Sequence, residues 1–292
     1  MANNAPDSLP DTTVGECLTS GARRLQEVDL PETRREARHL LGLVLGLSAD
    51  AVFAHPERPV SGEQRQNFAS LIVRRSLYEP LSRIIGRREF WSLSFAISPA
   101  TLDPRPDSET VIEAVIEARP DRDRTYSVLD LGTGSGCLIG ALLSEYPNAR
   151  GTAVDLSGAA LKTAAANLKD LGFAERATCL EAEWDQGLEG RFNIIVSNPP
   201  YIVDDEIATL DPAVLIYDPH LALAGGPDGL DAYRSLAPIL ARRLTPDGVA
   251  VIEHGDSQAH SVGDIFRAGG LTIAGGRADL AGRARCIVIT AS

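Results

Sequence analysis

The sequence has few of the residues that build metal sites and disulfide frameworks. Its four cysteines stand singly along the chain, at Cys17, Cys137, Cys179 and Cys286. This scattering gives neither a Cys-x-x-Cys metal knuckle nor a disulfide framework. The five histidines are equally dispersed, and His254 and His260 lack the i, i+4 spacing of a helical metal pair. We therefore expect no bound metal.

Long apolar runs are also missing. No segment approaches the roughly 18 uninterrupted apolar residues of a membrane-spanning helix. The opening segment MANNAPDSLPDTTVGE lacks the basic region and apolar core of a signal peptide. Hydrophobic residues make up 44% of the 292 residues and charged residues 23%, as is typical of globular proteins. We expect a cytoplasmic protein without a membrane partner, long enough for one large and one smaller domain.

Lysine is nearly absent, since only Lys162 and Lys169 occur among 28 basic residues. The 40 acidic residues give a net charge of −12, which repels a phosphate backbone over most of the surface. We therefore expect no stable nucleic-acid binding. One local cluster of arginines is an exception, at Arg74, Arg75, Arg83, Arg87 and Arg88. It is either a solvated face on and after a helix or a docking patch for an RNA-containing or acidic partner.

The first part of the chain has the apolar spacing of helices. In RREARHLLGLVLGL the residues Ala37, Leu40 and Leu41 recur at helical spacing, and Ser61 caps a second apolar stripe. These patterns predict a helical domain over residues 1–80. The segment RREFWSLSFAIS then has aromatic and β-branched residues around a polar break at Ser92. It predicts a β-hairpin in a linker over residues 81–106.

Residues 107–292 alternate strand-like and helix-like segments until about residue 268. This alternation predicts an α/β domain with a parallel, Rossmann-like sheet covered by helices. The last two strand-like runs, LTIAGG and ARCIVITA, leave no room for a helix between them. They predict an antiparallel pair at one edge of the sheet.

A glycine-rich loop follows the first strand of this sheet, in YSVLDLGTGSGC. Gly132, Gly134 and Gly136, with Thr133 and Ser135 between them, allow a tight turn and a close approach of a ligand to the next helix. The spacing G-x-G-x-G differs from the dinucleotide fingerprint G-x-G-x-x-G. The loop therefore predicts a nucleotide or nucleoside site, and its spacing does not indicate that the ligand contains a pyrophosphate.

Acidic and aromatic residues end the next two strands. Asp155 ends GTAVD, where a carboxylate can accept both hydroxyls of a ribose, although it could instead cap the following helix. Glu183 and Trp184 follow one strand later. An indole can stack on an adenine and a carboxylate can accept its exocyclic N–H, although a single tryptophan is more often part of a core.

The segment NIIVSNPPYI begins as a buried strand and ends in Asn198, Pro199, Pro200 and Tyr201. The two prolines fix two φ angles and remove two backbone donors, so the tip is rigid and presents carbonyl groups. The simplest interpretation is a strand-ending turn. However, ligands of open α/β sheets bind beyond the carboxyl ends of the strands, where all these motifs meet. A nucleoside cofactor without a pyrophosphate fits, and S-adenosylmethionine is the obvious candidate.

This arrangement suits transfer of a methyl group to a planar NH2 group. The side-chain oxygen of Asn198 and the carbonyl of Pro199 can each accept one N–H and aim the nitrogen, while Tyr201 can cover the group's π face. Two aligned acceptors favour the electron-rich, pyramidal nitrogen of the transition state. No acid, base or metal is required before transfer.

With these motifs the chain resembles the release-factor glutamine methyltransferases (PrmC, also called HemK) over nearly its whole length. The segments that carry the resemblance are the glycine loop, NPPY, GRREFW, PRPDSE, YDPHLALAGGPDGLDAYRSL, EHGDSQ and DLAGRARCIVI. The sequence departs from the family at Ser108, where Thr is usual, and at Glu183, where Asp is usual.

The resemblance implies a class I S-adenosylmethionine-dependent methyltransferase that modifies the glutamine amide in the Gly-Gly-Gln motif of bacterial class I peptide chain release factors. It implies that residues 198–201 hold the glutamine. We separately expect GRREFW and DPRPDSE to lie beside the crevice, with Arg105 near an anionic or carbonyl group of the substrate loop or donor. The cofactor residues would be Gly132, Thr133, Gly134, Ser135, Gly136, Asp155, Glu183, Trp184 and Asn198. We expect a monomer whose helical domain recognises the substrate.

Alternatives remain open both for the activity and for the role of Arg105. A DNA or RNA amino-methyltransferase shares NPPY, but it should carry a basic groove or a recognition insertion. An NAD-dependent oxidoreductase or a non-catalytic nucleotide-binding module would explain the sheet and Asp155 and leave NPPY unused. Arg105 could also form an ion pair with Asp107 or Glu109 at the start of a predicted helix over residues 109–118.

Overall fold

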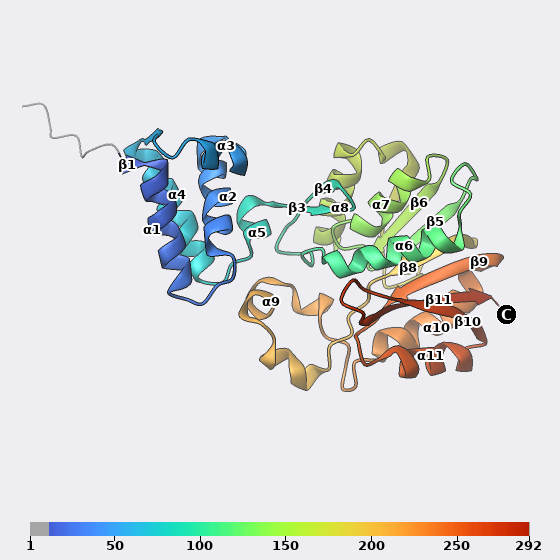
Figure 1. The fold of residues 1–292 in the computed structure, drawn as a ribbon. Helices are drawn as coiled ribbons and strands as arrows, with labels where there is room; N and C mark the ends of the chain where they lie inside the picture. The colour runs from blue at the N-terminus through green and yellow to red at the C-terminus, as the bar shows by residue number, and fades with distance from the viewer. Residues whose placement is uncertain (1–11, 292) are drawn as a thin grey trace, which may run out of the picture. The chain divides into compact units, whose positions relative to one another are not determined.

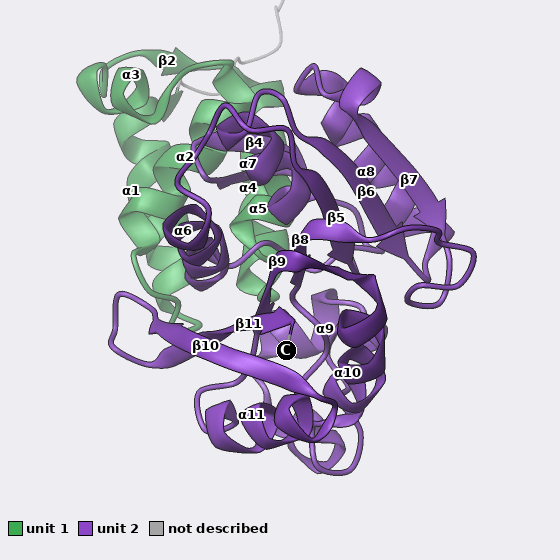
Figure 2. Ribbon diagram, turned by 90° about the vertical axis from the view of Figure 1, so that its right-hand side faces the viewer, with its two compact units in different colours: residues 1–85 green, residues 86–292 purple. Residues whose placement is uncertain are grey.

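The computed structural model describes residues 12–291, and the chain divides into two compact units between Ile85 and Gly86 (Figure 2). The predicted boundary at residue 80 lies five residues earlier, and residues 1–11 of that predicted domain lie outside the described part. Among residues 12–291 no helix has the length and apolar character needed to cross a membrane.

The first unit is helical, as predicted. Its elements are β1 (Thr12–Thr13), α1 (Val14–Gln26), α2 (Thr33–Leu45), α3 (Ala49–Ala54), β2 (Pro59–Val60), α4 (Gly62–Ser76) and α5 (Leu81–Ile85). The hydroxyls of Thr13 and Ser61 begin α1 and α4 in capping boxes. Leu25, Leu40 and Leu41 are fully buried in the common core, so helical spacing in the sequence predicted which faces pack together.

The arginine cluster is largely engaged in contacts within each unit. Arg74 pairs with Glu79 at 2.5 Å, and the buried Arg75 pairs with Glu36 at 2.7 Å. In the second unit Arg87 donates to Ser94, and Arg88 lies 3.9 Å from a carboxylate oxygen of Asp103. These pairs reduce the positive charge available to an acidic partner, and the docking role of the cluster stays a prediction.

The predicted hairpin opens the second unit as β3 (Arg87–Phe90) and β4 (Leu93–Ala96). Trp91 and Ser92 form a two-residue turn with φ of +54° and +57°, the geometry that matches the twist of two antiparallel strands. Phe90 and Phe95 are buried in the core of this unit. The hairpin is therefore part of the α/β unit rather than a free-standing connection.

The second unit contains a seven-stranded sheet, as predicted (Figure 1). Its strands are β5 (Ser127–Leu131), β6 (Arg150–Asp155), β7 (Ala177–Glu181), β8 (Phe192–Ser197), β9 (Leu244–Glu253), β10 (Leu271–Ala278) and β11 (Ala284–Ala291). The order is β10-β11-β9-β8-β5-β6-β7; the five strands from β5 to β9 are parallel, and β11 is antiparallel to both β9 and β10. The predicted antiparallel edge is confirmed.

Helices cover both faces of the sheet (Figure 1). The covering helices are α6 (Glu109–Ala118), α7 (Cys137–Glu145), α8 (Gly158–Asp170), α10 (Asp231–Arg243) and α11 (Ala259–Ala268). The unit also contains the short helix α9 (Pro212–Tyr217), which buries no residue, and the 3-10 turns η1 (Pro106–Ser108), η2 (Ala174–Arg176), η3 (Asp204–Thr209) and η4 (His220–Ala222). Adjacent residues Ile194 and Ile195 belong to separate clusters, one beneath α6 and α7 and one beneath α10 and α11. Alternate side chains of each strand thus supply two cores.

The strand order positions the site. From β5 the chain moves outward to β6 and β7, and it then returns to add β8 on the opposite side of β5. The connections after β5 and β8 therefore leave in opposite directions. Such a switch point opens a crevice beyond the carboxyl ends of the two strands.

Candidate active site

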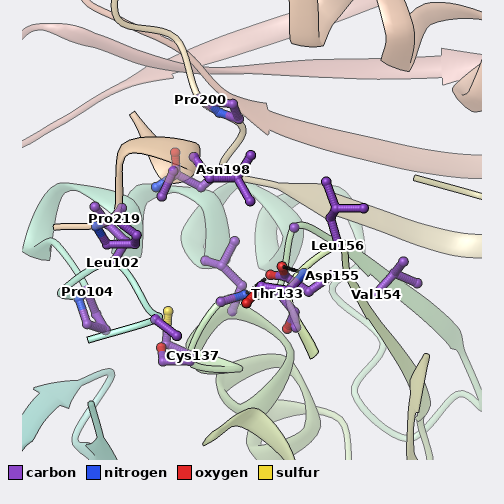
Figure 3. Close-up of a pocket in the computed structure, with 18 of the residues that line it drawn as sticks. Leu102, Pro104, Thr133, Cys137, Val154, Asp155, Leu156, Asn198, Pro200 and Pro219 are labelled. Carbon is purple, nitrogen blue, oxygen red and sulfur yellow. Dashed lines mark hydrogen bonds between the residues drawn. The ribbon is translucent and has the colours of Figure 1, made fainter. Parts of the chain in front are cut away.

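A cavity of about 340 Å³ lies at this switch point. Figure 3 shows Thr133 and Asp155, which follow or end strands β5 and β6, together with Asn198 and Pro200 after β8. Ten of the predicted site residues line it: Arg105, Gly132, Thr133, Gly134, Ser135, Asp155, Glu183, Trp184, Asn198 and Pro200. Gly136, Pro199 and Tyr201 do not. Tertiary structure thus brings most of the predicted motifs into one cavity.

The glycine loop has the backbone that its sequence requires. Gly132, Gly134 and Gly136 have φ of +74°, +56° and +80°, which residues with a Cβ rarely adopt. A Cβ added at Gly132 or Gly134 would point into open space, so both present bare backbone to the cavity. A Cβ at Gly136 would come within 3.2 Å of Ala164. The third glycine therefore serves close packing between α7 and α8.

Asp155 holds the glycine loop rather than the helix after it. Its Oδ2 accepts the backbone N–H of Gly134 at 2.8 Å, and its Oδ1 accepts that of Ser157 at 2.9 Å. The cap of α8 is Ser157, whose hydroxyl accepts from Ala160, so the helix-cap interpretation of Asp155 is wrong. Each carboxylate oxygen keeps a further lone pair for a ligand hydroxyl.

Glu183 and Trp184 lie at the next strand end, on the wall of the cavity. Trp184 has φ of +54° and packs against the core beneath α10 and α11. A non-glycine residue in this conformation is strained by about 1 to 3 kcal/mol. Glu183 is exposed and accepts from Gln186 at 3.2 Å. Leu156, which the sequence analysis did not select, lines the same cavity and is 54% exposed.

Asn198 has one side of its amide engaged by Ser108, and both residues line the cavity. Its Nδ2 donates to the hydroxyl of Ser108 at 3.2 Å, and the Ser108 side chain is 2% exposed. Because the amide nitrogen has this partner, the Oδ1 is the group left to accept a hydrogen bond from a ligand. Ser108 begins α6, and its contact with Asn198 was not anticipated from the sequence.

Pro199 and Tyr201 support the loop from behind. Pro199 is buried, and the ring of Tyr201 packs against the core beneath α10. Burial raises the pKa of the Tyr201 hydroxyl to about 12. The Tyr201 carbonyl accepts from Gln258 Nε2 at 3.0 Å, and Gln258 also donates to Gly229. The Tyr201 ring therefore packs against this core, and Tyr201 is not among the residues that line the cavity; its place over the substrate stays a prediction.

Arg105 lines the cavity and forms an ion pair with Asp218, with 2.6 Å between Nη2 and Oδ2. The predicted alternative, a pair with Asp107 or Glu109, is wrong, since Asp107 instead lies 3.1 Å from Arg283. The other oxygen of Asp218 accepts the backbone N–H of residue 103 at 3.3 Å. Both links join the DPRPDSE segment to the YDPHLALAGG segment across the cavity wall.

One acidic residue beneath the loop was missed. Asp130 is fully buried in β5, and its Oδ2 accepts the hydroxyl of Thr133 at 2.7 Å. Burial raises the pKa of Asp130 to about 7. Its Oδ1 has no hydrogen-bond partner within the described residues. The sequence VLDLG places this acid between apolar residues of a predicted buried strand, and that position could have indicated it.

Within the described residues, no group of three or more His, Cys, Asp or Glu side chains is arranged to hold a metal ion. The charged residues that line the cavity are Arg105, Asp155 and Glu183, and the arginine is paired. The cavity lining therefore has two carboxylates, and its one arginine is already neutralised by Asp218. This charge suits a cationic nucleoside better than an anionic pyrophosphate.

Comparisons with known proteins agree with this architecture. Residues 16–86 match the PrmC N-terminal domain, and residues 105–216 match the methyltransferase small domain. A methyltransferase structure from Pyrococcus furiosus shares the fold at 17% identity and a TM-score of 0.51, covering 77% of this chain and 98% of that one.

Relatives named release factor glutamine methyltransferase cover almost the full chain. One from Rhodospirillum rubrum is 43% identical over 94% of this chain and 84% of its own length. Another from Bradyrhizobium diazoefficiens is 42% identical over 96% of each chain. The matches therefore cover the helical unit as well as the unit that contains the sheet. The chain belongs to the release factor glutamine methyltransferase family.

Proposed function

We propose that this protein transfers a methyl group from S-adenosylmethionine to the side-chain amide nitrogen of the glutamine in the Gly-Gly-Gln motif of bacterial class I peptide chain release factors, supporting translation termination. The observation that carries the proposal is the amide of Asn198, whose nitrogen is engaged by Ser108 and whose oxygen is left for a ligand N–H. Its position on the same cavity as the glycine loop and Asp155 joins an amide-binding group to a nucleoside-binding group.

The residues of the cavity fit S-adenosylmethionine. The open space over Gly132 and Gly134 accommodates a ligand against bare backbone, and a cavity of about 340 Å³ is within the usual range for small-molecule sites. Asp155 has lone pairs for two ribose hydroxyls, and Trp184 with Leu156 offers apolar surface for an adenine. The carboxylates of Asp155 and Glu183, which line the cavity, suit a cationic ligand.

When bound, S-adenosylmethionine supplies an electrophilic methyl group on a positively charged sulfur. The chain's own contribution is to orient and polarise the amide. Asn198 Oδ1, on the cavity wall, accepts one N–H of the glutamine NH2 group. The backbone carbonyl of Pro199, which lies behind that wall, is the candidate acceptor for the other N–H. Amide nitrogen is a poor nucleophile because its lone pair is delocalised, and acceptors fixed before reaction favour the pyramidal nitrogen. The proline pair keeps both acceptors in place.

Mass spectrometry of a purified release factor, after incubation with this protein and the methyl donor, tests the proposal. We expect a mass increase of one methyl group on the Gly-Gly-Gln peptide. DNA and RNA oligonucleotides under the same conditions test the alternative amino-methyltransferase activity, and we expect no methylation of them. An unmodified release factor with a methylated nucleic acid would overturn the proposal.

Variants of Asn198 separate chemistry from binding. Asn198→Ala removes one acceptor and should slow transfer by about 10² to 10³, the typical cost of one preorganised contact. Asn198→Asp keeps an acceptor but adds a charge that favours the cationic ground state over the transition state. It should retain donor affinity and methylate far more slowly. Asn148→Ala, in an exposed loop of the same unit, is the control. Wild-type single-turnover rates in both Asn198 variants would refute the assigned role.

The remaining assignments follow from the same proposal. The helical unit recognises the release factor, the protein acts in the cytoplasm as a monomer, and nucleic acid is not a stable partner. Deleting residues 1–80 would be expected to weaken release-factor binding and to leave donor binding unchanged. Calorimetry with the two ligands separately checks both halves of that statement. Analytical ultracentrifugation checks the monomeric state.

A further inference from the structure

A buried carboxylate lies behind the reactive amide site. Glu253 is the last residue of β9, it is paired in register with Cys286 of β11, and only 1% of its surface is exposed. It does not line the cavity, so it cannot touch the substrate. Its Oε2 has no hydrogen-bond partner among the described residues. An acid in this position is costly, and nothing in the reaction described above uses it.

Glu253 is adjacent to the pair that orients the catalytic amide. The side chains of Ser108 and Asn198 both face it as hydrogen-bonding groups. Ser108 Oγ already accepts from Asn198 Nδ2 at 3.2 Å, so its single proton is free to be donated to Glu253. A hydrogen bond from the Ser108 hydroxyl to Glu253 would complete a directional chain from amide N–H to hydroxyl to carboxylate. The amide oxygen stays outside that chain.

Several charged and titratable groups set the state of this acid. Burial raises the pKa of Glu253 to about 7, whereas the Ser108 and Asn198 side chains and the charge of Arg285 lower it and Asp107 raises it. Tyr201, Tyr233, Cys137 and Cys286 are also within electrostatic reach. The pKa values of all four are raised to about 12 or beyond by burial, so they are neutral near pH 7. Glu253 therefore changes charge near pH 7, as does Asp130 beneath the glycine loop, whose pKa burial also raises to about 7.

We propose that Glu253, acting through Ser108, is a positioning residue that fixes the Asn198 amide with its oxygen toward the substrate. This inference rests on the proposed function and adds to it a residue that never contacts substrate or methyl donor. An asparagine amide presents a donor or an acceptor depending on a rotation of 180°. Only the orientation with the oxygen toward the substrate accepts an N–H.

Protonation of Glu253 reverses the chain. A neutral acid donates to Ser108, the hydroxyl proton can then turn toward Asn198, and the amide can rotate to accept it. The NH2 group of Asn198 would then face the NH2 group of the substrate, and one acceptor is lost. The deprotonated form holds the productive orientation, so transfer should accelerate as pH rises through the pKa of Glu253.

Glu253→Gln tests this directly, because glutamine imitates the neutral acid and does not titrate. The wild type should show a single-turnover rate that rises between about pH 6 and about pH 8. The variant should lose the part of this rise that Glu253 causes. At the upper end it should be at least about tenfold slower, part of the 10² to 10³ expected for one lost acceptor. Its donor affinity should be unchanged. Glu113→Gln, which removes the same charge from a surface ion pair, is the control.

Substitutions at Ser108 test the relay. Ser108→Ala removes the hydroxyl and should slow transfer to the level of Glu253→Gln. Ser108→Thr keeps the hydroxyl and should restore most of the rate. If Ser108→Ala transfers as fast as the wild type, or if Glu253→Gln keeps the wild-type pH profile, the relay does not exist.

A spectroscopic measurement needs no substrate. In protein labelled with 15N-asparagine, the side-chain resonances of Asn198 can be identified by their loss in Asn198→Asp. They should titrate with a midpoint near pH 7 in the wild type and not in Glu253→Gln. Identical titration in both proteins would overturn the proposal. If the wild type methylates no release factor but these resonances behave as expected, the proposed function fails and the positioning role stands.

Discussion

Asp155 offers a sharp test of the methyl-donor site, because its contacts separate ligand binding from loop support. Each oxygen accepts one backbone N–H, from Gly134 at 2.8 Å and from Ser157 at 2.9 Å, and keeps a lone pair for a ribose hydroxyl. Asp155→Ala removes two potential charge-assisted bonds to the ligand, each worth about 1.5 to 3 kcal/mol. Water compensates in part, so we expect a loss of about 3 kcal/mol, or roughly 150-fold in Kd.

The same substitution leaves two backbone N–H groups without their acceptor. Asp155 is only partly buried and lines the cavity, so water can reach both groups, and the cost to folding should be about 1 kcal/mol. Calorimetric titration with S-adenosylmethionine measures the binding loss, and denaturant unfolding measures the stability. Asp170→Ala, at the exposed end of α8, removes the same charge as a control. A folded Asp155→Ala variant with a Kd within about twofold of wild type would refute the reasoning.

Three further perturbations have defined outcomes. Gly134→Val should abolish donor binding by calorimetry, because φ is +56° and the new side chain fills the ligand space, whereas Gly275→Val, which meets open space, should bind normally. Arg105→Glu places a second carboxylate beside the buried Asp218 and should lower the free energy of unfolding by about 2 to 4 kcal/mol in denaturant titrations. Arg124→Glu, which breaks the exposed pair with Asp247, should change that free energy little. Burial raises the pKa of Asp130 to about 7 in the folded protein, from an ordinary value of 3.8. The folded state therefore binds more protons between these two values, so stability falls as pH rises from about 4 to about 7. Asp130→Asn should flatten that part of the profile of Tm against pH; an unchanged slope would contradict the assigned burial.

Local signals account for the parts of the site that the sequence predicted. The spacing of Gly132, Gly134 and Gly136 reports backbone conformations that only glycine adopts easily, and all three have positive φ. Asp155 and Asn198 were found because each directly follows or ends an apolar strand. Since parallel strands end at one edge of a sheet, their meeting in one cavity followed from the chain order.

Tertiary contacts decided the partners of the charged and polar groups. Arg105 had near neighbours Asp107 and Glu109 in sequence, yet it pairs with Asp218, more than a hundred residues away. Distance along the sequence could not identify which of several equally charged acidic residues would pair with Arg105. The same limit applies to Tyr201, whose ring packs against the core beneath α10 and α11.

The sequence by itself determined the fold class, the antiparallel edge of the sheet, and the residues that reach its carboxyl end, because periodicity and turn residues act over a few positions. Only the tertiary structure placed Ser108 and Glu253 behind Asn198. These three residues come from the start of α6, the end of β9 and the loop after β8, and no local pattern links them. These residues meet because of the order of strands in the sheet and the packing of α6 over it. The burial of the two hydrophobic cores fixes both of these features.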